Sequence, residues 1–417
     1  MPKPNHPLVG LDIGNTRVRV LIAAWNPDKD RLDVLGASSV ASKGVRKGVI
    51  VNIESAEECI RQALTEAEHM AGVDAHQVHV GLSGAHVRGH NGRGVVAISR
   101  KNREITVADI RRVIDQASAI NLPSDREIVE VLPQEFIVDD QDGIGDPLGM
   151  LGMRLEVIVH IVTSPITAKQ NIVTSVNRSG MIVSDLTLES LAAAEATLSE
   201  EEREYGVALI DIGGEITSLA IYQRGAVRHT SVIPLGGTHF TNDIAVGLRA
   251  PFPEAERIKR HFGCSFGPLL DTCERETVLE VLNVGGRVSK TLSRQLLCDM
   301  LQPRAEELFC QIQEEIHHSG YERQLSSGLV LTGGGSLLAG VPEIAERILD
   351  VPVRLGSPQG FDGIADDLIS PEYATVAGLV LHAARQQVLG RTSWNQNGLR
   401  RHSARLKNWW LELKNLF

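Results

Sequence analysis

The stretch LVGLDIGNTRVRVLIAAW, residues 8–25, decides the fold of this 417-residue chain. It reads as an apolar strand, a glycine-containing turn and a second strand rich in β-branched residues, which predicts a β-hairpin. The same pattern returns at residues 208–222, ALIDIGGEITSLAIY, where Asp211 takes the place of Asp12. A repeat 199 residues apart is too long for a solenoid, whose period is about 20–50 residues. The repeat therefore predicts two homologous halves that face each other.

Strands alternate with helical stretches in the rest of each half, which predicts α/β layering. Two inserts interrupt the pattern. Residues 85–164 open with an expected hairpin around Asn91-Gly92, because this dipeptide is a strong turn signal. Residues 246–303 are charged and are expected to be largely helical. Residues 387–398 lose the helical periodicity and read as a linker.

Three glycine-rich turns follow predicted strands, at residues 12–16, 211–217 and 332–336. Successive backbone N–H groups in such turns bind anions, and glycine lets the backbone approach phosphate oxygens closely. The first two turns each begin with an aspartate, and Mg²⁺ takes few protein carboxylates while it keeps several waters. No GxxxxGK[ST] motif is present, which excludes a P-loop. The pattern predicts a site for phosphate groups with magnesium.

At this point the sequence resembles the FtsA family of bacterial cell-division proteins, a branch of the actin/Hsp70/sugar-kinase superfamily. The resemblance covers nearly the whole chain. It is carried by GLDIGNTRVRV, HVGLSGA before the first insert, LTLESLAAAEA, ALIDIGGEITSLAIY, PLGGTHFTNDIA, AERIKRHFG, VLTGGGSLLAGV and a tryptophan-bearing C-terminal segment.

The resemblance implies an actin-like α/β fold with two RNase-H-like halves around a nucleotide cleft. The first half (subdomain 1A) would comprise residues 1–84, 165–205 and 371–388, with 85–164 as the family-specific insert (1C). The second half (2A) would comprise 206–245 and 304–370, with 246–303 as subdomain 2B. Residues 389–398 would be the linker and 399–417 a membrane-targeting amphipathic helix.

The resemblance also implies ATP and Mg²⁺ as cofactors. Asp12 and Asp211 would hold Mg²⁺ through water. Glu256 and Lys259, three positions apart on one helical face, would reach the ribose and adenine. The residues expected around the nucleotide are Asp12, Gly14, Asn15, Thr16, Arg17, Asp211, Gly213, Gly214, Glu215, Thr217, Gly236, Gly237, Glu256, Lys259, Gly333, Gly334, Gly335 and Ser336.

Hydrolysis needs a group that positions the attacking water, and Glu189 in LTLESLAAAEA is the candidate for this catalytic role. A lysine that some superfamily ATPases bring from another subdomain has no counterpart here. We therefore expect nucleotide binding with at most weak ATPase activity.

The C-terminal segment is expected to be an amphipathic helix on a membrane surface. At 100° per residue its apolar side chains fall within an arc of about 120°. Basic residues flank this arc, a composition typical of a helix that lies in a bilayer interface. The apolar residues are Leu399, Leu406, Trp409, Trp410, Leu413, Leu416 and Phe417, and the basic ones include Arg400, Arg401, Arg405 and Lys407. The tail carries a charge of +4, against −14 for residues 1–398.

Composition limits the remaining choices. The net charge of −10 argues against nucleic acid as a partner. Five scattered cysteines without a CxxC exclude a disulfide scaffold and a zinc ribbon. The N-terminus lacks the apolar core of a signal peptide, and no apolar run approaches the roughly 20 residues of a membrane span. These features predict a cytosolic chain, and the resemblance implies that it attaches peripherally to the inner membrane.

The resemblance implies a polymerising protein that anchors the tubulin-like FtsZ ring to the cytoplasmic face of the membrane at the division site. Its partners would be the C-terminal peptide of FtsZ, further copies of itself, anionic lipid, and later division proteins that bind residues 85–164. Arg287, Lys290 and Arg294 in the second insert are candidates for the FtsZ peptide. Two alternatives stay open: a small-molecule kinase of the same superfamily, and a platform ATPase for pilus or secretion assembly.

Overall fold

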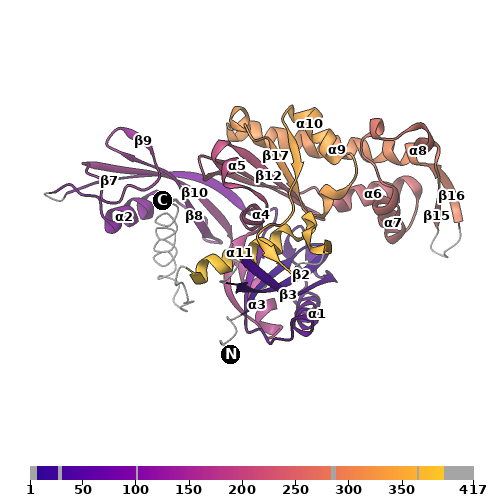
Figure 1. Ribbon diagram of the computed structural model, residues 1–417, viewed down its shortest axis with the longest axis horizontal. Coiled ribbons are helices and arrows are strands. Elements are labelled where there is room, and N and C mark those ends of the chain that lie inside the picture. Colours follow the sequence, from indigo (N-terminus) through magenta and orange to yellow (C-terminus); the bar gives the residue numbers. More distant parts are fainter. Residues whose placement is uncertain (1–6, 27–30, 100–101, 283–287, 364–365, 389–417) are drawn as a thin grey trace.

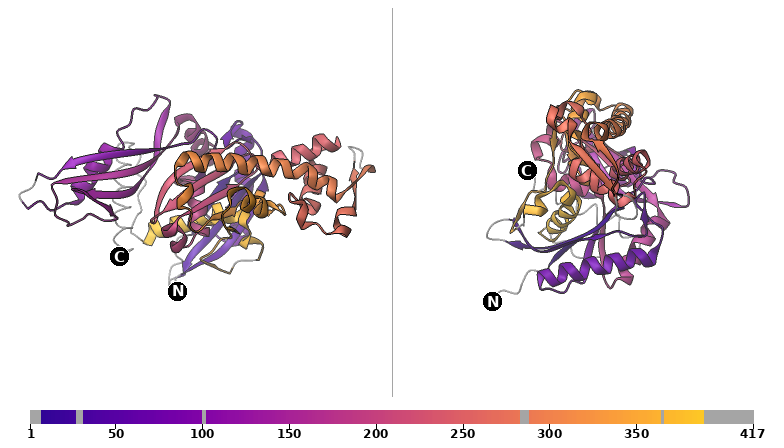
Figure 2. Two further views of the ribbon diagram at one scale, coloured as in Figure 1. Left: turned by 90° about the horizontal axis from the view of Figure 1, so that it is seen from above. Right: turned by 90° about the vertical axis from the view of Figure 1, so that its right-hand side faces the viewer.

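The computed structural model describes residues 7–26, 31–99, 102–282, 288–363 and 366–388. The predicted linker and membrane tail, residues 389–417, lie outside the described residues, as does Arg287. The molecule is elongated, with two sheet-containing halves at its centre (Figure 1). The insert that carries α2 projects at one end, and the segment that carries α7 and α8 projects at the other (Figures 1 and 2).

The first half is built on a six-stranded sheet with the order β11-β6-β1-β2-β3-β19. The strands are β1 (Leu8–Ile13), β2 (Arg17–Asn26), β3 (Arg31–Ala41), β6 (Gln77–Leu82), β11 (Ile182–Leu188) and β19 (Phe361–Asp362). Side chains alternate between the two faces of a strand. Val9 and Leu11 pack on one face with helices α1 (Ile53–Ala71) and α3 (Ile166–Arg178), whereas Leu8 packs on the other with α11 (Ala374–Val388).

Helix α11 lies closely between β1 and α4 (Glu189–Thr197) because glycines replace bulkier residues at the contacts. A Cβ atom on Gly10 of β1 would lie 2.7 Å from the carbonyl oxygen of Val376. A Cβ atom on Gly378 of α11 would lie 1.6 Å from the carbonyl oxygen of Ala192. The last helix of the described chain therefore packs directly against its first strand.

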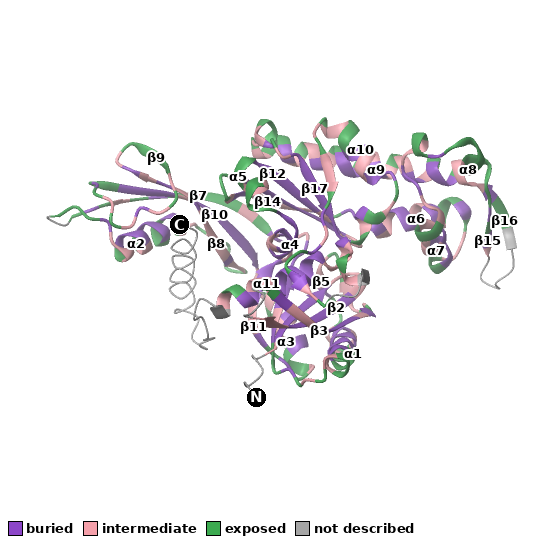
Figure 3. Cartoon of the chain, viewed as in Figure 1, coloured by how far each residue is buried: buried purple, intermediate pink, exposed green. Residues whose placement is uncertain are grey.

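The second half repeats this plan on a five-stranded sheet with the order β14-β13-β12-β17-β18. As β1 pairs antiparallel with β2 and parallel with β6, so β12 pairs antiparallel with β13 and parallel with β17. The strands are β12 (Val207–Ile212), β13 (Thr217–Gln223), β14 (Ala226–Ile233), β17 (Leu329–Thr332) and β18 (Val353–Leu355). The helices are α5 (Glu200–Tyr205), α6 (Gly237–Leu248), α9 (Arg294–Ser319) and α10 (Val341–Leu349). Both sheets are largely buried between helices (Figure 3).

The first insert is a four-stranded sheet with the order β7-β10-β8-β9, covered by α2 (Val107–Ala117). Its strands are β7 (Arg88–Ala97), β8 (Arg126–Val138), β9 (Gln141–Ile144) and β10 (Arg154–Pro165). The expected hairpin at Asn91-Gly92 is wrong, because β7 runs straight through this dipeptide and pairs with β10. Gly92 serves packing instead of turning, since its Cβ would lie 2.5 Å from the carbonyl oxygen of Ala117 in α2.

The second insert is less helical than its composition predicts. It contains α7 (Phe252–Phe262) and α8 (Thr272–Glu276), but also a two-stranded sheet of β15 (Val278–Leu282) and β16 (Val288–Ser293). A short pair of strands, β4 (Val45–Arg46) and β5 (Val49–Ile50), lies in the first half. Within the ranges given above, no helix is both long and apolar enough to cross a bilayer.

Candidate nucleotide site

The turns that join β1 to β2 and β12 to β13 have the same backbone geometry. The N–H of Gly14 donates to the carbonyl of Arg17 at 3.0 Å, and the N–H of Gly213 donates to the carbonyl of Ile216 at 2.9 Å. A Cβ would lie 2.8 Å from the Arg17 carbonyl oxygen at position 14, which excludes a side chain, and 3.0 Å from the Ile216 carbonyl oxygen at position 213, which leaves little room for one. The sequence repeat is thus a structural repeat.

The two turns face each other across the junction of the halves. A Cβ on Gly214 would lie 2.6 Å from Cγ2 of Thr16. The Nδ2 of Asn15 donates to the Glu215 carboxylate at 3.1 Å, and the backbone N–H of Lys47 donates to the same carboxylate at 2.6 Å. Of the predicted nucleotide residues, Asn15, Thr16, Gly214 and Glu215 therefore lie together, with Glu215 bridging the halves.

Helix α6 begins directly against the second turn. The N–H groups of Gly237 and Thr238 donate to the carbonyls of Gly213 and Gly214, at 2.9 Å and 2.7 Å. A Cβ on Gly236 would lie 2.7 Å from the Gly213 carbonyl oxygen. The start of α6 thereby fixes the backbone of the turn, and this close approach accounts for the glycine at position 236.

Three carboxyl groups converge where the two sheets meet. Burial raises the pKa of Asp12, at the end of β1, to about 6; Arg19 counteracts this and Asp211 adds to it. Burial likewise raises the pKa of Asp211, which a hydrogen bond from Thr375 and the charge of Arg19 lower. Burial raises the pKa of Glu189 well above its ordinary value, and the charges of Asp12 and Asp211 raise it further. The site thus has an excess of buried negative charge.

Glu189 reaches this cluster from the first position of α4. Its Cγ would lie 2.8 Å from a Cβ on Gly81 in β6, so the glycine makes room for the side chain. A hydrogen bond from Ser83 favours the ionised carboxylate, but less strongly than burial opposes it. The hydroxyl of Ser83 also lies 3.2 Å from that of Ser218 in β13, which joins the halves beneath the carboxylates.

The third glycine-rich turn closes onto the second. Gly333 has φ +80°, in the left-handed region that glycine tolerates, and its Cβ would lie 2.2 Å from Oδ1 of Asp211. A Cβ on Gly335 would lie 2.3 Å from Cγ2 of Ile212. The Ser336 hydroxyl donates to the Gly333 carbonyl at 2.7 Å, inside the turn, so this buried side chain shapes the loop.

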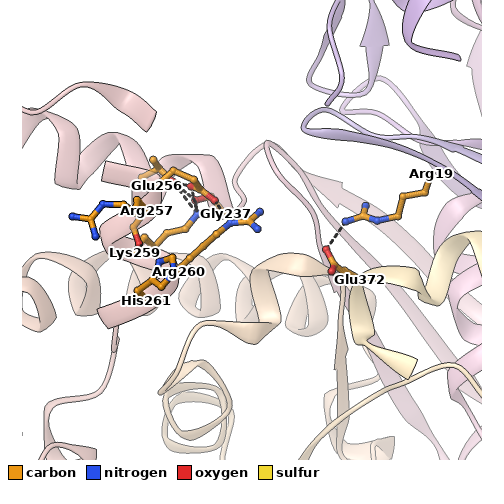
Figure 4. A network of polar contacts seen from close by, with 9 residues as sticks. Arg19, Gly237, Glu256, Arg257, Lys259, Arg260, His261 and Glu372 are labelled. Atoms are coloured by element: carbon orange, nitrogen blue, oxygen red, sulfur yellow. Dashed lines mark hydrogen bonds and ion pairs between the residues drawn. The ribbon is translucent and has the colours of Figure 1, made fainter. Parts of the chain in front are cut away.

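Glu256 and Lys259 lie on α7 and point at the start of α6 (Figure 4). The Lys259 ammonium donates to the Gly237 carbonyl at 2.9 Å and lies 2.8 Å from Oε2 of Glu256. Burial raises the pKa of Glu256, but hydrogen bonds and charges from Lys259, Thr241 and Arg260 outweigh it and lower this pKa to about 2. Glu256 is therefore ionised, and the pair ties α7 to the start of α6.

Two other side chains predicted at the nucleotide form hydrogen bonds to backbone carbonyls of the protein. The Thr217 hydroxyl is buried and donates to the Leu235 carbonyl at 2.7 Å. Arg17 donates to the Ser39 carbonyl at 3.3 Å. The hydroxyl of Thr217 therefore ties the start of β13 to the segment that joins β14 to α6, and the backbone of Thr217 is the part that lies at the turn.

The segment that begins α11 supplies residues that sequence reasoning missed. The Thr375 hydroxyl donates to Asp211 at 3.0 Å, and the Gly333 N–H donates to the Pro371 carbonyl at 3.1 Å. Glu372 accepts from Arg19 at 2.6 Å (Figure 4). The start of α11 thus contacts all three turns, directly or through Arg19.

The donor set fits a divalent cation that keeps its water shell. Asp12 and Asp211 offer two buried carboxylates with raised pKa values, so a nearby cation would relieve their repulsion. Among the described side chains, no group of three is arranged to ligate a metal directly. Mg²⁺ holds several waters and takes one or two carboxylates plus phosphate oxygens, which matches this pair.

The predicted partner-binding cluster is only partly described. Arg294 is bound within the insert, since its guanidinium donates to the Phe262 carbonyl at 3.1 Å and to Glu274 at 2.7 Å. Lys290 is exposed and donates to the Leu248 carbonyl at 3.2 Å. Of the two that the structure describes, Lys290 is the more exposed. The predicted membrane-binding residues, from Arg400 to Phe417, lie outside the described residues.

Comparison with known families gives two matches along the chain. Residues 208–378 match the family model "Cell division protein FtsA", and residues 84–163 match "SHS2 domain inserted in FTSA". Curated relatives named "Cell division protein FtsA" include one from Pseudomonas aeruginosa, 44% identical over 91% of this chain and 90% of its own. The relative from Neisseria meningitidis is 40% identical over 96% of both chains, and that from Escherichia coli is 36% identical over 92% and 91%.

Solved structures with similar folds are actin-like. A chain of the PilM-PilN type IV pilus biogenesis complex has a TM-score of 0.67 at 19% identity and covers 91% of this chain and 99% of its own. MreB5 of Spiroplasma citri bound to ADP has a TM-score of 0.54 at 15% identity, covering 92% and 98%. At these identities the likeness shows the fold alone, and it confirms the predicted actin-like architecture.

Proposed function

This chain belongs to the FtsA family of bacterial cell-division proteins, and from that membership we propose that it binds ATP with Mg²⁺, polymerises and anchors the FtsZ ring to the membrane. An actin-like role in cell division is what the family shares. The observation that carries the nucleotide part is the pair of matching turns, which face each other with Asp12 and Asp211 behind them.

The residues around the turns would bind different parts of the nucleotide and its metal. Gly14, Gly213 and Gly214 would let the backbone approach the phosphates, and Gly333 to Ser336 would line the adenosine side next to Lys259. Asp12 and Asp211 would hold Mg²⁺ through water. When bound, Mg²⁺ would supply positive charge that offsets the phosphates and both carboxylates.

We propose binding with at most weak turnover. A residue that positions and activates water works best as an ionised carboxylate at neutral pH. Burial and two neighbouring acids disfavour that form of Glu189, the only candidate sequence reasoning supplied for this role. A cation between Asp12 and Asp211 would partly relieve this penalty, so nucleotide with metal would set how well Glu189 can act.

The anchoring part of the proposal rests on residues 399–417 and on avidity. A single interfacial helix binds reversibly, whereas many helices along one polymer rebind at high effective concentration. The FtsZ peptide would bind the second insert near Lys290, which is exposed on a body whose net charge is negative. The first insert would recruit later division proteins.

The kinase and pilus-platform alternatives have less support. The curated relatives named above, at 36–44% identity, are cell division proteins, and no specific observation favours phosphorylation of a small substrate. The likeness to the PilM chain, at 19% identity, supports a shared fold and does not support a shared role in pilus assembly.

Co-sedimentation with anionic vesicles tests the proposal directly. The full chain should sediment with vesicles in the presence of ATP and Mg²⁺, and it should carry FtsZ with it. A chain that ends at residue 398 should leave both proteins in the supernatant. If the shortened chain sediments as well as the full chain, the tail is not the anchor; if FtsZ stays behind while the full chain sediments, the tethering role is wrong.

A further inference from the structure

Arg19 occupies a buried position between the carboxylate of Asp12 and the segment that begins α11. In the β1–β2 hairpin, Arg19 is the cross-strand partner of Asp12, and such partners lie on the same face of a sheet. Its NH1 lies 3.8 Å from Oδ2 of Asp12, and its NH2 donates to Glu372 at 2.6 Å. The guanidinium also lies 5.3 Å from the centre of the Tyr373 ring. The side chain is only 11% exposed.

The bonding of this guanidinium is incomplete. Its buried Nε has no hydrogen-bond partner among the described residues. A buried donor without an acceptor is costly, and so is a buried charge that is not fully paired. Arg19 is therefore held there by its charge, because it is the cation that offsets both Asp12 and Asp211.

A magnesium ion bound through the same aspartates would lie close to the Arg19 guanidinium. Two positive groups that share one carboxylate repel each other, and the repulsion is strong where water is excluded. Glu372 also pairs with the guanidinium, at 2.6 Å, so it sets how far Arg19 is drawn toward Asp12.

We propose that Arg19 is an internal counter-ion that competes with Mg²⁺ for Asp12 and Asp211, and that Glu372 tunes this competition. Arg19 is a positioning residue in this scheme, since it acts through the aspartates. The inference rests on the proposed nucleotide site and adds what sets its metal requirement. Because Glu372 lies in the turn before α11, metal binding is thereby coupled to the start of that helix.

Calorimetric titration of the full chain with ATP, repeated over a series of Mg²⁺ concentrations, tests the competition. Arg19→Gln removes the competing charge, so the Mg²⁺ concentration for half-maximal ATP binding should fall, on the order of three- to tenfold. Glu372→Gln leaves Arg19 paired with Asp12 alone, so that concentration should rise. Arg19→Lys keeps the charge and should stay close to the wild type.

The opposite signs separate competition from a structural role, because general loosening of the site would weaken binding in both variants. Arg31→Gln is the matched control, since Arg31 forms an exposed ion pair with Asp362 on the same half, and its Mg²⁺ requirement should not change. Shifts of equal sign for Arg19→Gln and Glu372→Gln, or no shift in either, would overturn the role of Arg19. A wild type that binds no ATP at any Mg²⁺ concentration would refute the nucleotide site itself, and this inference with it.

Discussion

Replacing Asp12 by asparagine should make the nucleotide-free protein more stable while it removes Mg·ATP binding. Burial raises the pKa of Asp12 from 3.8 to about 6 in the folded state. The folded protein therefore holds this proton more tightly than the unfolded chain does. The stability that this proton contributes is complete below pH 4 and is lost as the pH rises to about 6.

The size of the effect follows from that shift. Each pKa unit corresponds to about 1.4 kcal/mol, so roughly two units predict that the variant gains up to ~3 kcal/mol at pH 8. At an unfolding entropy of about 2.1 cal/mol/K per residue, this corresponds to a rise of about 3 °C in Tm. Asparagine resembles the protonated carboxyl in shape, so the gain should disappear near pH 4.

Thermal unfolding from pH 4 to pH 8 in EDTA measures this difference. Asp140→Asn is the matched control, because the Asp140 side chain is 98% exposed, and it should leave Tm unchanged. Mg·ATP at about 100 times its Kd should stabilise the wild type by about 2.7 kcal/mol and the Asp12→Asn variant hardly at all. A variant that is less stable than the wild type at pH 8, or that responds equally to Mg·ATP, would refute the reasoning.

Three further outcomes are expected. Gly334→Asp should fold normally, because the nearest atom to its Cβ would be 3.8 Å away. The added charge should abolish ATP binding in calorimetry, whereas Gly334→Asn should retain it. The double variant Trp409→Glu, Trp410→Glu should remain in the supernatant with anionic vesicles, whereas Phe replacements should sediment. Arg294→Glu should lower the free energy of unfolding by about 1–3 kcal/mol, measured in urea, because it breaks the Glu274 ion pair and leaves a backbone carbonyl without its donor.

The parts of the site that the sequence predicted are local in the chain. Asp12 and the turn at Gly14 lie within one hairpin, and the repeat at Asp211 shows that a second copy exists. A turn of this kind needs glycine for backbone reasons that hold in any protein, so its signal survives without tertiary information.

The residues that were missed depend on contacts that are distant in sequence. Glu372 reaches Arg19 across 353 residues, and no local pattern reports such a pair. Arg19 itself left a signal, because the register of the predicted hairpin places it opposite Asp12. Charges directly opposite each other on adjacent strands interact, so this pair could have been inferred from the hairpin.

The hairpin wrongly placed at Asn91-Gly92 shows the opposite limit. A glycine beside an asparagine signals a turn when nothing else explains it. Here the glycine lets α2 approach β7, together with Gly94, whose Cβ would lie 2.3 Å from the Val113 carbonyl oxygen. Local sequence cannot tell a glycine that turns the chain from one that admits a neighbouring helix.

The position of α11 between β1 and α4 also fixes when this molecule becomes complete during synthesis. The first strand is made early, but the core cluster that holds Leu8 lacks its α11 side chains until that helix has been made. Glu372 and Thr375, at the start of that helix, are made equally late, so the candidate nucleotide site lacks both residues for most of translation. Domains generally fold as units from the N-terminus during synthesis, and this one must wait. A chain that stops before Ala374 therefore exposes apolar surface to chaperones and proteases, because it lacks the helix that packs against both β1 and α4.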